Sequence, residues 1–155
     1  MLTQTLYDQD FHQWIEKTIN QLEQRDFNNL DINHLIEELK DLGKSDKNAL
    51  ESNLVILLAH LLKLKIQAGT PDTMKASWYR SVIEHRERLL MQLENIPSLK
   101  SYLPTILNTS YPKGRKIAIK ESKLATFGIA IPDEKDYPLT YPFSLEQILN
   151  EDYYG

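Results

Sequence analysis

The stretch LVILLAHLLKLKI, residues 54–66, decides the fold, because as a helix it is apolar on nearly every side. It is too short to cross a bilayer, which takes about 20 apolar residues, and His60, Lys63 and Lys65 interrupt it. A helix of this kind is buried among other helices. We therefore predict that the helix containing residues 46–67 is the central element of a helical bundle, and we expect no association with a membrane.

Two amphipathic segments precede this central helix. Residues 7–24 place one apolar face at helical spacing, formed by Tyr7, Phe11, Trp14, Ile15, Thr18 and Leu22. Asp31 is a good N-cap for a second segment, whose apolar stripe consists of Ile32, Leu35, Ile36, Leu39 and Leu42. Gly43 either ends this helix or lies within one long helix, and the pattern fits both.

The remainder of the chain also has a helical period up to residue 124. One predicted helix carries Trp78, and kinked helical pieces follow across Pro104 and Pro112. After residue 124, FGIAIPDEKDYPLTYPF has three prolines and predicts an extended tail on the surface. Ser144 with Gln147 forms a capping-box pattern, which predicts a short terminal helix.

Composition supports one ordinary folded domain. The chain has 155 residues, of which 41% are hydrophobic and 26% charged, and its formal net charge is −4. These values predict a single all-α domain over residues 1–155, with about five to six helices in a compact bundle over 1–124 and a wrapping tail over 125–155. The chain has no cysteine, which excludes thiol catalysis and fits a cytoplasmic protein.

Arg86 projects from the middle of an apolar stripe formed by Trp78, Val82, Leu89 and Leu93. A guanidinium keeps its charge, so its burial requires hydrogen-bonded partners. Glu37, Glu38 and Glu121 are the candidate partners for an internal ion pair. The alternatives are a snorkelling side chain and an anion-binding site.

Two further groups of polar residues are candidate sites. His60 and Lys63 lie on a polar strip of the central helix, where His60 is a candidate general base or metal ligand. Together with Arg86 and the three glutamates they form the candidate polar cluster Glu37, Glu38, His60, Lys63, Arg86 and Glu121. His34 and Glu38 are spaced i,i+4 and form a weak candidate site for Mn, Fe or Zn, although a solvated acidic face explains them equally simply.

The run KGRKIAIKESK, residues 113–123, is a weak candidate for contact with nucleic acid. Its candidate phosphate-binding residues are Lys113, Arg115, Lys116 and Lys120. A solvated helix face accounts for them as well, since the net charge is negative and no aromatic residues are interleaved to stack on bases.

Several segments together resemble a known family. LYDQDFHQWIEKT, HLIEELKDLGKSDKNAL, LLAHLLK, SWYRSVIEHR, PSLKSYL and YPFSLEQILNEDYY occur in this order. From Tyr7 to Tyr153 the chain resembles the mainly cyanobacterial family called domain of unknown function twenty-nine. The resemblance implies an all-helical fold and no assigned activity, and Pro104 and Pro112 depart from a more regularly helical stretch of that family.

Three functions stay open on the sequence. The first is a cytoplasmic interaction or scaffold module that binds a protein partner or associates with itself. The second is an enzyme that uses a small molecule or metal in a Glu/His/Arg pocket, and the third is a protein associated with nucleic acid through residues 113–123. No cofactor, substrate or catalytic residue can be named.

Overall fold

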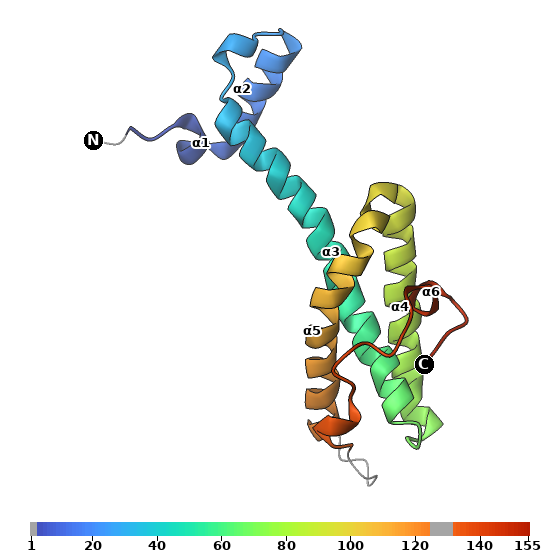
Figure 1. The fold of residues 1–155 in the computed structure, drawn as a ribbon. Coiled ribbons are helices and arrows are strands. Elements are labelled where there is room, and N and C mark those ends of the chain that lie inside the picture. The colour runs from blue at the N-terminus through green and yellow to red at the C-terminus, as the bar shows by residue number, and fades with distance from the viewer. Residues whose placement is uncertain (1–2, 125–131) are drawn as a thin grey trace. The chain divides into compact units, whose positions relative to one another are not determined.

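The computed structural model describes residues 3–124 and 132–155, and all regular structure in these residues is helical (Figure 1). The elements are α1 (Leu6–Gln9), α2 (Phe11–Glu23), η1 (Phe27–Asn29), α3 (Ile32–Ile66), α4 (Asp72–Asn95), η2 (Pro97–Tyr102), α5 (Leu103–Leu124), η3 (Glu134–Asp136) and α6 (Leu145–Leu149). The predicted all-α class and the short C-terminal helix are therefore confirmed. Among the described helices, none combines the length and hydropathy that a membrane crossing requires.

The chain groups into two compact units, Met1–Ser45 and Asp46–Gly155. We call them the N-terminal unit and the C-terminal unit and describe each by itself. The prediction of one domain over residues 1–155 stays a prediction.

The N-terminal unit begins with two helices where the sequence predicted one. Asp10 leaves the helical backbone conformation, and its Oδ1 accepts a hydrogen bond from the Gln13 N–H (3.0 Å), which caps α2. Asp31 precedes α3 as predicted, and its Oδ1 accepts from the His34 N–H at 3.4 Å. Gly43 lies within α3, so of the two alternatives the structure has the mid-helix glycine.

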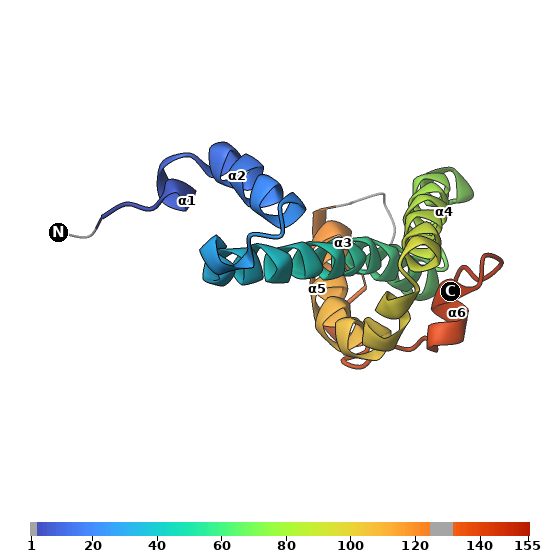
Figure 2. The same ribbon diagram turned by 90° about the horizontal axis from the view of Figure 1, so that it is seen from above.

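The C-terminal unit is built around residues 46–66 of α3. Both views place α4 and α5 beside this part of the helix (Figures 1 and 2). Every side chain from Leu57 to Leu64 is buried except that of His60, which is half-buried, and this agrees with the apolar pattern. Leu50 and Leu54 are also inaccessible to solvent. The predicted central role of this helix is confirmed.

Helix α5 approaches α3 closely at one glycine. A Cβ atom built on Gly114 would lie 2.8 Å from the Val55 carbonyl oxygen and 3.3 Å from Leu58 Cβ. The two helices therefore pack backbone against backbone at this point. Pro112 lies inside α5 rather than ending a helical piece, and Pro104 occupies the second position of the helix, where a missing N–H costs little.

The segment 132–155 is more deeply integrated than the predicted surface tail. Tyr137, Phe143 and Ile148 are all buried in the core of the C-terminal unit. The predicted capping box is present, since Ser144 Oγ accepts from the Gln147 N–H and Gln147 Oε1 accepts from the Ser144 N–H. Most other residues of 132–143 are exposed or half-buried, so the expected tail on the surface is present and is anchored by a few buried side chains, while its portion 125–131 lies outside the described residues.

Candidate functional site

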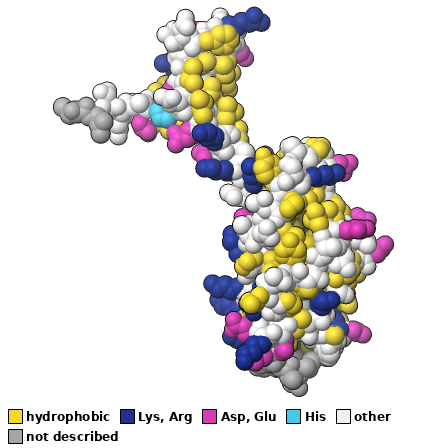
Figure 3. Space-filling view, in the orientation of Figure 1, with side chains coloured by type: hydrophobic (Ala, Val, Ile, Leu, Met, Phe, Trp, Pro, Cys, Tyr) yellow, Lys and Arg dark blue, Asp and Glu magenta, His cyan; other side chains and the backbone are white. Residues whose placement is uncertain are grey.

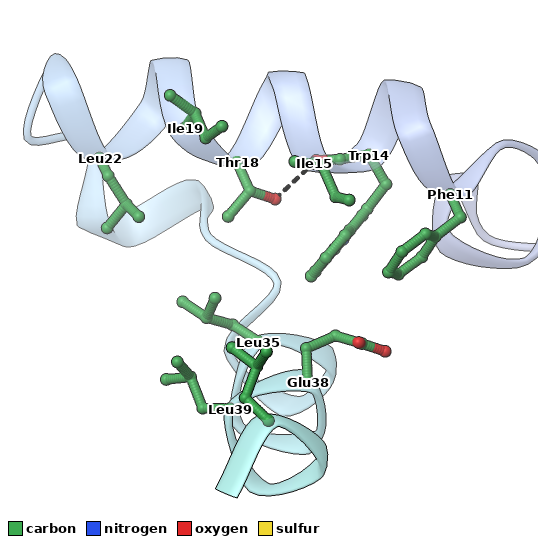
Figure 4. Close-up of a pocket in the computed structure, with 10 residues that line it drawn as sticks. Phe11, Trp14, Ile15, Thr18, Ile19, Leu22, Leu35, Glu38 and Leu39 are labelled. Carbon is green, nitrogen blue, oxygen red and sulfur yellow. Dashed lines mark hydrogen bonds between the residues drawn. The ribbon is translucent and has the colours of Figure 1, made fainter. Parts of the chain in front are cut away.

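An apolar groove runs along the N-terminal unit between α2 and the first turns of α3 (Figure 4). It encloses about 360 Å³. Its lining has one carboxylate, Glu38, one hydroxyl, Thr18, and otherwise apolar side chains: Phe11, Trp14, Ile15, Ile19, Leu22, Leu35, Leu39 and Leu42. We call this site the N-terminal groove.

Hydrogen bonds and ring contacts hold the inner wall of the groove in place. Trp14 Nε1 donates to Asp31 Oδ2 (3.3 Å), and Thr18 Oγ1 donates to the Trp14 carbonyl (2.8 Å). The Tyr7 ring packs edge-on against Trp14 and stacks on His34. These contacts satisfy the polar atoms beside the groove, so the exposed lining of the groove consists mainly of apolar carbon atoms.

The titratable groups around Tyr7 are engaged with one another. Tyr7 Oη donates to Glu38 Oε1 (2.5 Å), and this bond raises the pKa of Tyr7 to about 12. His34 Nδ1 lies 2.6 Å from Asp31 Oδ2; their hydrogen bond raises the pKa of His34 and lowers that of Asp31. The two weak candidate metal ligands, His34 and Glu38, thus bond different neighbours. No group of three or more His, Asp or Glu side chains in the described residues could hold a metal ion.

Three members of the predicted polar cluster do come together in the C-terminal unit. Lys63 Nζ donates to Glu121 Oε2 and lies 5.0 Å from the centre of the Trp78 ring. His60 is close enough to both charges for them to act on its titration, while burial is the largest cause that lowers the pKa of His60 to about 4. His60 Nδ1 is buried without a partner among the described residues. This arrangement keeps His60 neutral near pH 7, and Glu37 and Glu38 belong to the N-terminal unit.

Arg86 is buried, as predicted, with 2% of its surface exposed. Its partners are three backbone carbonyl oxygens of the C-terminal segment and not a glutamate. Nε donates to Ile148 O (2.8 Å), Nη2 to Tyr153 O (2.7 Å) and Nη1 to Glu151 O (3.5 Å). The expectation that Glu37, Glu38 or Glu121 pairs with it is therefore wrong. The Ile148 carbonyl lies in the last turn of α6, where helix carbonyls have no partner within the helix, and the other two acceptors follow the helix, so all three can accept from a cation.

Two side chains of the basic run 113–123 form polar contacts with other residues of the chain. Lys113 Nζ pairs with Glu51 Oε1 (2.7 Å). Arg115 donates to the Tyr137 and Glu134 carbonyls at 3.0 and 3.1 Å, which fastens the C-terminal segment to α5. Lys116 and Lys120 are exposed. Two of the four candidate phosphate-binding residues thus have structural partners.

Sequence reasoning missed the N-terminal groove, although the two predicted stripes contain all of its lining except Ile19 and Glu38. It interpreted both apolar stripes as core faces. In the structure many of these residues are exposed, and of the described residues in this unit only Trp14 and Thr18 are buried. The signal available was the width of the stripes, because two short helices cannot bury two wide faces against each other.

Comparison with known proteins gives one match. Residues 6–154 match the family described as Domain of unknown function DUF29. No curated protein matches, and no solved structure matches. The match covers nearly the whole chain and indicates no activity. The chain belongs to the DUF29 family, as its resemblance at the motif level implied.

Proposed function

We propose that this chain is a helical protein-interaction module whose binding surface is the N-terminal groove. The observation that carries the proposal is the exposure of large apolar side chains around this groove. Eight such side chains in the N-terminal unit are each between 41% and 65% exposed: Phe11, Ile19, Leu22, Leu39 and Leu42 line the groove, and Phe27, Ile32 and Ile36 lie elsewhere in the unit. Figure 3 shows hydrophobic side chains gathered in a strip on the visible face of this unit.

The chemistry of the groove favours a helical partner. Single exposed apolar residues are common on protein surfaces, but a contiguous patch marks an interaction site. The groove offers few polar groups, and the one carboxylate in its lining already accepts a hydrogen bond from Tyr7. An amphipathic helix satisfies its own backbone and inserts apolar side chains at i, i+3, i+4 and i+7, so it suits a wall of this kind.

The other two functions receive no comparable support. The guanidinium of Arg86 and the ammonium of Lys63 bind groups of the chain itself. Lys113 and Arg115 do the same. We therefore propose an interaction module without catalysis, and its cytoplasmic location stays a prediction.

Site-specific photo-crosslinking in the cells that express the chain tests this proposal. A benzophenone amino acid replaces Leu42, which is 65% exposed in the groove, and in a matched control it replaces Met91, which is 61% exposed on α4. We expect one dominant adduct from position 42, and mass spectrometry should map it to an amphipathic helix. Equal or absent adduct formation at the two positions would contradict the proposal.

A further inference from the structure

The exposed area of the N-terminal unit is large for a unit with so small a core. A fully exposed large apolar residue presents on the order of 200 Å². Of the eight partly exposed residues named above, the five that line the groove offer on the order of 500 Å², and Phe27, Ile32 and Ile36 raise the total for the unit to about 800 Å², which is what each partner buries in a standard stable complex. A unit of this size, in which only two described residues are buried, gains much of its stability when that area is covered.

The charges beside the apolar face differ between its two helices. On α2, Glu16 and Glu23 lie three residues before and four residues after Ile19, so they adjoin it on the same side of the helix. On α3, Lys40 and Lys44 follow Ile36 at spacings of four. All four charged side chains are exposed, and in the part of the chain that the structure describes Glu23, Lys40 and Lys44 form no ion pair. Glu37 and Asp41 lie further around α3 and line one depression with Lys40 and Lys44, so α3 is basic only along the edge beside Ile36. This edge complements the acidic edge of α2.

We infer that the occupant of the N-terminal groove is a second copy of this chain. A surface with an acidic edge on α2 and a basic edge on α3 is self-complementary under a two-fold axis, because α2 of each copy can meet α3 of its partner. The apolar faces then cover each other, and Glu16 and Glu23 approach Lys40 and Lys44 of the other copy. This inference rests on the proposed function and names its partner.

Sedimentation equilibrium of the full chain tests the inference. We expect the wild type to have twice the 18.1 kDa mass of one chain. Leu39→Glu places a charge in the groove at a position that is 59% exposed, so it should yield a folded monomer, with the fold checked by circular dichroism. Met91→Glu, at an equally exposed position on α4, should remain a dimer.

Charge reversal supplies a test that does not alter the apolar lining. Glu16→Lys with Glu23→Lys should weaken the dimer about tenfold or more, and adding Lys40→Glu with Lys44→Glu should restore it. A dimer that survives Leu39→Glu overturns the inference, and so does a wild type that stays monomeric at every concentration. If the wild type is monomeric, a crosslink from position 42 to a different protein would still support the groove as a binding surface for a protein partner. Equal or absent crosslinking at positions 42 and 91 would contradict both the proposed function and the association of two copies.

Discussion

Arg86 donates hydrogen bonds to three carbonyl oxygens of the C-terminal segment, 62 to 67 residues further along the chain. Burial lowers the pKa of Arg86, but an arginine still keeps its charge, so these carbonyl dipoles are what solvates the cation. The side chain therefore fastens α6 and the residues after it to α4. Its place in an apolar stripe is explained by this structural role.

Replacing Arg86 by Met should lower the free energy of unfolding by about 3 kcal/mol, because one buried and two partly buried carbonyls lose a charged donor while the volume of the stem is kept. Thermal and urea denaturation measure this loss, and hydrogen exchange should become faster in residues 145–154. Arg88→Met is the matched control, since Arg88 pairs with Glu84 in an exposed position and should change stability by less than about 1 kcal/mol. Equal effects of the two substitutions would contradict the role assigned to Arg86.

His60 should make stability depend on pH between 6.5 and about 4. Its pKa in the folded chain is about 4, against an ordinary value of 6.5, because burial and the Lys63 charge oppose protonation. The unfolded chain therefore binds a proton in this window that the folded chain does not, and stability falls as the pH is lowered from 6.5. Stability curves of His60→Gln should be flatter than wild type in this window, and those of His12→Gln, on an exposed face, should match wild type. A wild-type slope in His60→Gln would refute the assignment.

At the scale of the helix, replacing Gly43 or Gly114 by alanine should change the stability of the chain in opposite directions. A methyl group at position 114 would meet the backbone of α3 at 2.8 Å, so Gly114→Ala should destabilise the chain by about 1–3 kcal/mol despite the higher helix propensity of alanine. Nothing lies within 4 Å of a Cβ at position 43, so Gly43→Ala should stabilise it by roughly 0.5–1 kcal/mol. Urea denaturation of the two variants checks both signs. Two shifts of the same sign would contradict this packing of α5 on α3.

The helices also differ in how well the sequence pattern predicted them. The all-round apolar pattern of residues 54–66 correctly indicated a buried central helix, because only burial on every side makes such a pattern stable. The break at Asp10 was missed, since the apolar face from Tyr7 to Trp14 keeps its period while the aspartate caps a new helix. Pro112 was expected to interrupt α5, but packing on α3 holds the helix together across it.

At the scale of the whole molecule, apolar pattern and burial agree in one unit and diverge in the other. In the C-terminal unit the predicted stripes are the core. In the N-terminal unit the stripe of α3 leaves Leu39 and Leu42 exposed. The sequence could not distinguish these cases, because periodicity reports that a face is apolar and not what covers it. The hydrogen-bond partners of Arg86 could not be predicted either, because they are backbone carbonyls, which every residue has.

Association of two copies through the N-terminal groove would place one spin label on each copy at a defined distance from the other. The chain has no cysteine, so Lys17→Cys on the exposed side of α2 provides a single spin-labelling site. We expect double electron–electron resonance to detect one intermolecular distance for this labelled chain, and we expect Leu39→Glu in the same background to abolish it. Absence of any dipolar coupling, or a coupling that Leu39→Glu leaves unchanged, would show that the two copies do not associate through this groove.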